Sequence, residues 1–103
     1  MSGSNPEEVV TTVTLPLKKP IKLDDKELTE INLNFDKMSG KDILSIDAEL
    51  RREGIYFDDL WNQKVVLKLA SRGSGIIEDD LLLLHPGDFL ELTLRTRNFF
   101  LKW

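Results

Sequence analysis

The sequence predicts an α+β fold in which an N-terminal β-hairpin is followed by three to four α-helices. Two patterns carry this prediction. Apolar and polar residues alternate over much of residues 12–35, with the period of strands that bury one face. After residue 39, apolar residues recur at helical spacing between capping and breaking residues. The 103 residues fit a single domain, expected over residues 11–103, behind a loose polar tail at residues 1–10.

The predicted hairpin spans residues 12–35. Alternation is clearest over residues 13–17 and again over residues 31–35. The acidic pair Asp24-Asp25, followed by lysine, supplies the turn between the two strands. Pro16 interrupts the first strand. Because proline has no N–H to donate across the ladder, it indicates an edge strand or a β-bulge.

The first helix is expected at about residues 40–53. Ser39 is a suitable N-cap, and Asp42 occupies the acidic position of a capping box three residues later. Arg51 and its neighbouring arginine lie in the last turn, where positive charge complements the helix dipole. Gly54 is suited to the left-handed position just after the helix.

A second helix is predicted at about residues 58–72, starting at Asp58 or Asp59. Its buried stripe is expected to contain Leu60, Trp61, Val65 and Leu69, with Leu67 as a further candidate. The run Ser71-Arg72-Gly73-Ser74-Gly75 is interpreted as a helix stop and a flexible link. A short third helix is expected at residues 78–84, with an acidic first turn.

The last segment fits two patterns. Leu90, Leu92 and Leu94 alternate with polar residues as in a strand, whereas the larger apolar residues of 89–103 also form a helical stripe. Pro86 suits the first turn of a helix, and Asp88 would place negative charge near its N-terminus. These two residues favour a helix over residues 87–101.

The chain offers little for catalysis or for metal and cofactor binding. It has no cysteine, which excludes disulfides, thiolate metal ligands and a thiol nucleophile. The single histidine, His85, precedes a proline and is interpreted as a cap or a surface residue. The acidic runs Asp24-Asp25, Asp58-Asp59 and Glu78-Asp79-Asp80 stand where turns and helix starts use acidic residues as caps. We therefore predict no catalytic residue, no metal site and no cofactor.

Charge and hydropathy narrow the class of partner. The formal net charge of −4 argues against nucleic acid, which requires a basic surface. The longest apolar run, Leu81 to Leu84, is too short to span a membrane, and the first ten residues do not resemble a signal peptide. The expectation is a soluble intracellular domain that binds other protein chains, with neither nucleic acid nor membrane as a partner.

The C-terminal residues are unusually apolar for a chain end. Phe99, Phe100, Leu101 and Trp103 are large, and chain ends are normally polar and exposed. They either pack a terminal helix onto the core or form a surface for a partner, and one helix cannot hide all of them on one side. We name these four as partner-binding candidates, with the leucine run from Leu81 to Leu84 as second choice.

Four segments resemble the tail assembly chaperones of tailed phages and prophages. The runs LPLKKPIK from Leu15 and KELTEINL from Lys26 resemble the N-terminal hairpin of that family. The run FDKMSGKD from Phe35 resembles the entry to its first helix. The stretch from Asp88 to the NFFL run that ends at Leu101 resembles its closing helix. The resemblance covers most of the chain from Thr12 onward, in the family's order.

The resemblance implies a function and a setting. Such chaperones coat the long tape-measure protein, keep its helices in solution and help to recruit tail-tube protein. The chain is then expected to be a homo-oligomer in the cytoplasm of a bacterial host and to be absent from the mature virion. It resembles the short form of the family, which some phages extend by a translational frameshift. The family has no catalytic residues, and the resemblance implies none here.

Two other functions remain open at this point. One is a generic non-catalytic adaptor that binds a single defined partner. The other is a small enzyme or metal-dependent binder that uses the acidic runs, in which case divalent cations would raise the melting temperature.

Overall fold

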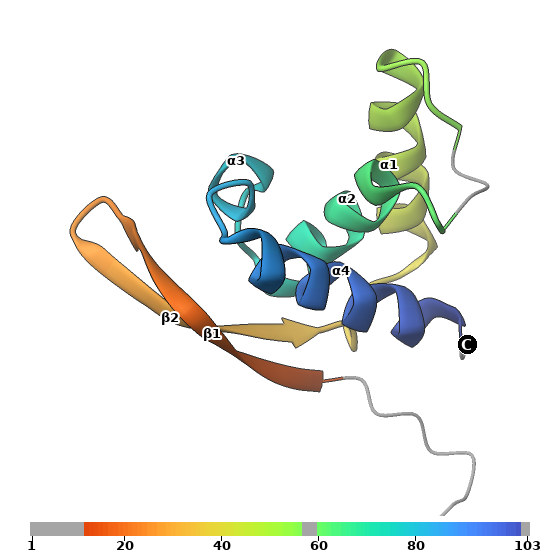
Figure 1. The fold of residues 1–103 in the computed structure, drawn as a ribbon. Coiled ribbons are helices and arrows are strands. Elements are labelled where there is room, and N and C mark those ends of the chain that lie inside the picture. The colour runs from red at the N-terminus through yellow and green to blue at the C-terminus, as the bar shows by residue number, and fades with distance from the viewer. Residues whose placement is uncertain (1–11, 57–59, 102–103) are drawn as a thin grey trace, which may run out of the picture.

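The computed structural model of the chain describes residues 12–56 and 60–101 (Figure 1). In these ranges it shows an antiparallel β-hairpin followed by four helices, so the predicted α+β class is confirmed. The elements are β1 (Thr12–Leu23), β2 (Lys26–Asn34), α1 (Gly40–Arg52), α2 (Gln63–Ser74), α3 (Glu78–Leu81) and α4 (Pro86–Leu101). The predicted tail at residues 1–10 and the pair Asp58-Asp59 lie outside the described residues.

The hairpin contains the irregularity that Pro16 predicts. Up to Pro16 each residue of β1 pairs regularly with β2, and pairing resumes at Ile21 in a shifted register. Residues 17–20 of β1 are therefore accommodated opposite Thr29 of β2. Extra residues on one strand leave backbone N–H groups that the ladder does not use, and a bulge must find other acceptors for them.

Helices α2 and α4 pack on the hairpin and close the main core (Figure 1). The buried apolar residues of this core come from the hairpin and the residue after it, α2, α3, the residues after α3, and α4: Leu15, Ile31, Leu33, Phe35, Leu67, Ala70, Leu81, Leu84 and Leu92. A second, smaller cluster joins α1 to α2: Ile46, Leu50, Val65 and Leu69. Helix α2 contributes to both clusters, which makes it the central element of the fold.

The ends of α1 agree with the sequence analysis. The Ser39 side chain accepts from the backbone N–H of Lys41 at 3.2 Å, and Asp42 accepts from the N–H of Ser39 at 3.0 Å. Both halves of the capping box are thus present. Gly54 follows the C-cap with a φ of +78°, the left-handed conformation expected there.

The predicted bounds of α2 need correction at both ends. The helix begins at Gln63 instead of residue 58, because the Asn62 side chain accepts from the N–H of Lys64 at 2.8 Å and caps it there. Leu60 and Trp61 lie in a turn before it. The helix continues to Ser74 and ends at Gly75, whose φ is +74°. The glycine-containing run is therefore mostly helical, and only its last residue ends the helix.

Of the remaining helices, α3 is shorter than predicted and α4 is confirmed as a helix. Helix α3 ends at Leu81 instead of residue 84, because the following N–H groups of Leu83 and Leu84 bond carbonyls three residues back, as in turns. Helix α4 spans Pro86–Leu101, which decides between the strand and helix patterns of that segment. Burial on two neighbours, the hairpin and α2, explains why its apolar residues fit no single narrow stripe.

Thr96 of α4 places a polar hydroxyl group in the core. Its hydroxyl is buried and has no hydrogen-bond partner in the described part of the chain. Thr96→Val keeps the shape and removes this hydroxyl, so we expect the free energy of unfolding to rise by about 1 kcal/mol in urea denaturation. Thr93→Val is the matched control, because the buried Thr93 hydroxyl donates to the Leu90 carbonyl at 3.1 Å. A gain in stability for Thr93→Val but none for Thr96→Val would contradict this assignment.

Candidate interaction surface

Phe99 and Phe100, the described aromatic residues near the C-terminus, pack against the main core. Phe99 and Phe100 are half-buried, and both contact Phe35, with ring centroids 4.6 Å and 5.0 Å from it. The two rings are also 5.5 Å from each other, edge to face. Leu101 is exposed, and Trp103 lies outside the described residues. Of the three described first-choice partner residues, Leu101 is therefore the one classed as exposed, at 51%.

The second-choice leucines divide into buried and exposed pairs. Leu81 and Leu84 are part of the main core, with 0% and 7% of their surface exposed. Their neighbours Leu82 and Leu83 are 57% and 59% exposed. The turn after α3 thus directs the middle two leucines of this run outward, and these two are the more accessible ones.

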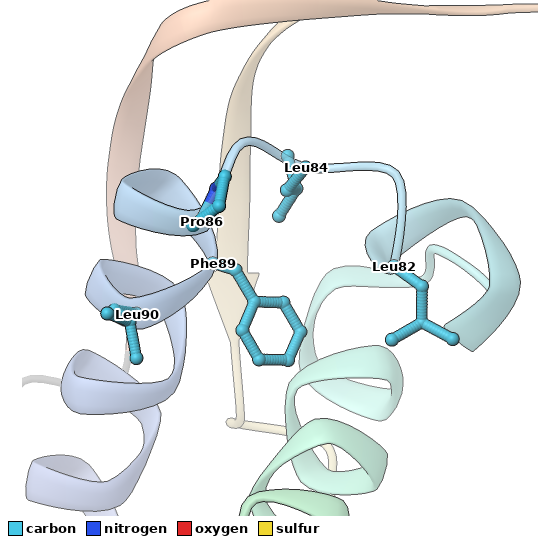
Figure 2. A pocket seen from close by; sticks show the side chains of 5 residues that line it. All are labelled: Leu82, Leu84, Pro86, Phe89 and Leu90. Atoms are coloured by element: carbon cyan, nitrogen blue, oxygen red, sulfur yellow. The ribbon is translucent and has the colours of Figure 1, made fainter.

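A groove lies between the end of α3 and the start of α4 (Figure 2). Its volume is about 360 Å³, and every lining residue is apolar: Leu82, Leu84, Pro86, Phe89 and Leu90. Figure 2 shows the Leu82 and Phe89 side chains directed into the space between the two helices. We call this feature the α3–α4 groove. It is open to solvent and suited to receive an apolar side chain.

Exposed leucines extend this apolar surface along α4. Leu90, Leu94 and Leu101 are all exposed, and their spacing of four and then seven residues places them on one edge of the helix. We call these three residues the α4 leucine edge. With a rise of about 1.5 Å per residue, the edge is about 16 Å long. On one flank it is bordered by Glu91 and Arg95, which form an ion pair at 2.7 Å.

Trp61 lies beside the far end of the edge. Arg97 of α4 places its guanidinium 5.0 Å from the centre of the Trp61 ring. The same side chain donates to the Leu60 carbonyl at 2.7 Å and to the Gln63 side chain at 2.6 Å. Trp61 is 69% exposed, so its predicted place in the buried stripe of α2 is wrong. It lies before the helix, in the turn that Arg97 holds against α4.

Ionic side chains hold α1 and α3 to α2. The Lys68 ammonium is buried and contacts Glu49, Glu53 and Glu78 at 3.3 Å, 3.0 Å and 3.1 Å. Burial by itself lowers the pKa of Lys68, but the three carboxylates outweigh it, so its pKa is raised. The lysine therefore stays charged and acts as a structural cross-link between helices.

The single histidine, His85, lies in the turn that leads into α4. His85 accepts the N–H of Gly87 at 3.2 Å through Nδ1, at the start of α4, as its predicted capping role requires. Within residues 12–56 and 60–101, no group of three or more acidic or histidine side chains is arranged to hold a metal ion. The features that stand out on the described surface are thus apolar ones.

Comparison with known proteins returned no relative for this chain. No protein family, no curated protein and no solved structure matches it. Among the described helices, none combines the length and the apolar character needed to cross a membrane.

Proposed function

We propose that this chain is a tail assembly chaperone of a tailed phage or prophage, which binds helical segments of the tape-measure protein and keeps them in solution. The α4 leucine edge, continuous with the α3–α4 groove, is the observation that supports this proposal. The resemblance of the hairpin and closing helix to that family supplies the identity of the client. No catalytic step is part of the proposal.

The surface has the form that helix-binding proteins use. An amphipathic helix docks by laying its apolar stripe into a hydrophobic groove, with anchors three, four or seven residues apart. The edge presents leucines at matching intervals, and the groove accepts one deeper anchor at its end. Contact with these side chains would shield apolar client residues that otherwise aggregate.

The wider role follows from the same proposal. Several copies would coat one long client, and tail-tube protein would be recruited to the coated complex. The copies would act in the bacterial host cytoplasm and leave before the virion is complete.

The test is co-expression with a tape-measure fragment from the same phage genome. We expect the chain to move the fragment into the soluble fraction, and the double variant Leu82→Asp/Leu90→Asp to bind it about tenfold or more weakly. Both leucines are exposed, so the variant should fold. Leu44→Asp on α1 is the control, because Leu44 is 70% exposed and lies away from the groove in the sequence and on another helix.

Two outcomes would contradict the proposal in different ways. A wild-type chain that leaves the fragment insoluble would exclude the chaperone function and favour an adaptor with another partner. Full solubilisation by the double variant would keep the function but exclude the groove as the contact.

A further inference from the structure

We infer that in the absence of client the α4 leucine edge is covered by α4 of a second copy, with the two helices antiparallel about a two-fold axis at Leu94. A two-fold contact must be self-complementary, because the same surface serves both copies. The spacing, the side-chain sizes and the charges of α4 meet this requirement. Only the displacement of the second copy by client rests on the proposed function.

The spacing of α4 places a large residue against a small one. Leu101 stands seven residues after Leu94, and Gly87 stands seven residues before it. An antiparallel pair centred on Leu94 therefore brings Leu101 of one copy opposite Gly87 of the other, both about 10 Å from the axis. The arrangement repeats at the other end by symmetry.

Gly87 leaves room for that leucine. The residue is exposed, and a Cβ built on it would meet only the His85 ring, at 3.4 Å. Its chain neighbour Pro86 lines the α3–α4 groove together with Leu90. Leu101 of the second copy would thus rest beside the rim of the groove, where apolar side chains surround it.

The two flanks of the edge are complementary as well. Glu91 and Arg95 lie on the same flank, and the two-fold brings Glu91 of one copy to within about 3 Å, along the helix axis, of Arg95 of the other. Opposite charges then alternate across the contact. On the other flank, the two-fold axis places Arg97 near Leu90 of the second copy, together with the Trp61 ring that stacks on the Arg97 guanidinium.

The pair would also regulate the proposed function. Helix α4 of the second copy presents leucines at the intervals of an amphipathic client, so client and second copy compete for one surface. The chain would then expose its client-binding surface only when a helix is available to replace the partner.

Cysteine cross-linking tests the pairing directly, because the chain has no cysteine of its own. Leu94→Cys places the two thiols at the axis, within the Cα separation of up to about 7 Å that a disulfide needs. Under mild oxidation we expect it to form covalent dimers at least about tenfold faster than Asn98→Cys. Asn98 is exposed one turn further along α4, and the two-fold holds its two copies about 12 Å apart along the helix axis.

A mixture of two single-cysteine variants provides a second test of the pairing. Gly87→Cys and Leu101→Cys should cross-link to each other faster than either does to itself. Leu44→Cys on α1 reports the rate of random collision, because Leu44 is exposed and outside the contact. Equal rates for Leu94→Cys, Asn98→Cys and Leu44→Cys would overturn the pairing.

Adding the tape-measure fragment separates this inference from the proposed function. Slower cross-linking of Leu94→Cys in its presence is the expected result. A fragment that binds without slowing the reaction would overturn the competition. If the client is solubilised but no Leu94→Cys dimer forms, the pairing is refuted and the proposed function stands. If the dimer forms but the client is not bound, the proposed function is refuted and the pairing stands.

Discussion

Phe35→Ala should lower the free energy of unfolding by about 3 to 5 kcal/mol, a large part of the stability of a domain this size. Phe35 is 1% exposed and its ring contacts both Phe99 and Phe100, so its loss leaves a cavity under the last turn of α4. Urea denaturation monitored by circular dichroism measures the change. A loss below about 1 kcal/mol would show that the C-terminal rings are not held by this contact.

Gly73 provides the internal check on that result. A Cβ at Gly73 would lie 2.7 Å from Cζ of Phe35, which is closer than two carbon atoms can approach. Gly73→Ala alone should therefore destabilise the protein, by about 1 to 3 kcal/mol. In the Phe35→Ala background the same change should be neutral or stabilising, because the methyl group enters the cavity and alanine favours the helix by about 1 kcal/mol. Additive losses would contradict the assigned contact.

Asp88→Ala should cost about 2 to 3 kcal/mol, from the loss of two charge-assisted hydrogen bonds. The Asp88 carboxylate is buried and accepts the backbone N–H groups of Lys18 and Lys19, each at 3.0 Å. These are amides of the β1 bulge, which α4 thereby fastens to itself. Asp88→Asn keeps one acceptor oxygen and should lose about half as much. Asp79→Ala, at an exposed acidic residue of α3, should change stability by less than about 0.5 kcal/mol.

The Asp88 contact should also make stability depend on pH. Burial favours the neutral carboxyl, but the two N–H donors outweigh it and the pKa of Asp88 is lowered. A carboxylate with a lowered folded pKa stabilises the protein fully above its unfolded value of about 3.9 and loses that contribution as the pH falls through the folded pKa. The difference in unfolding free energy between wild type and Asp88→Ala should therefore shrink below about pH 4. A difference that stays constant down to pH 2 would exclude ionised Asp88 as the acceptor.

This anchor bears on the proposed function. Asp88 lies between Pro86 and Leu90, two residues that line the α3–α4 groove. Fastening the bulge to this turn fixes the start of α4, and with it one wall of the groove. We therefore expect Asp88 variants to weaken client binding through the position of α4, without any contact to the client.

The sequence by itself determined the features that depend on near neighbours in the chain. Alternation predicted the hairpin, and Pro16 indicated an edge strand or a bulge; the register shift of β1 begins directly after it. Ser39, Asp42 and Gly54 predicted both ends of α1, since caps act within one turn. Pro86 correctly favoured a helix for the last segment.

Only the tertiary structure decided which side chains reach the surface. Leu81 and Leu82 are identical in chemistry, and the packing of α3 on the core buries the first and exposes the second. Trp61 is apolar enough for the core, but the helix starts after it and Arg97 of α4 holds it outside. Composition and spacing carry no information about such contacts between distant segments.

The same reason explains the two residues whose roles the sequence did not reveal. From the sequence, Asp88 is interpreted as an acidic residue at a helix start. In the structure its carboxylate accepts hydrogen bonds from backbone amides about 70 residues earlier in the chain. From the sequence, Gly73 is interpreted as a helix breaker. In the structure it lies within α2, where the Phe35 ring occupies the space that a side chain at this position would need. In each case the residue type is explained by a contact with a residue that only folding brings close. Caps, turns and strands, by contrast, depend on residues a few positions away in the chain.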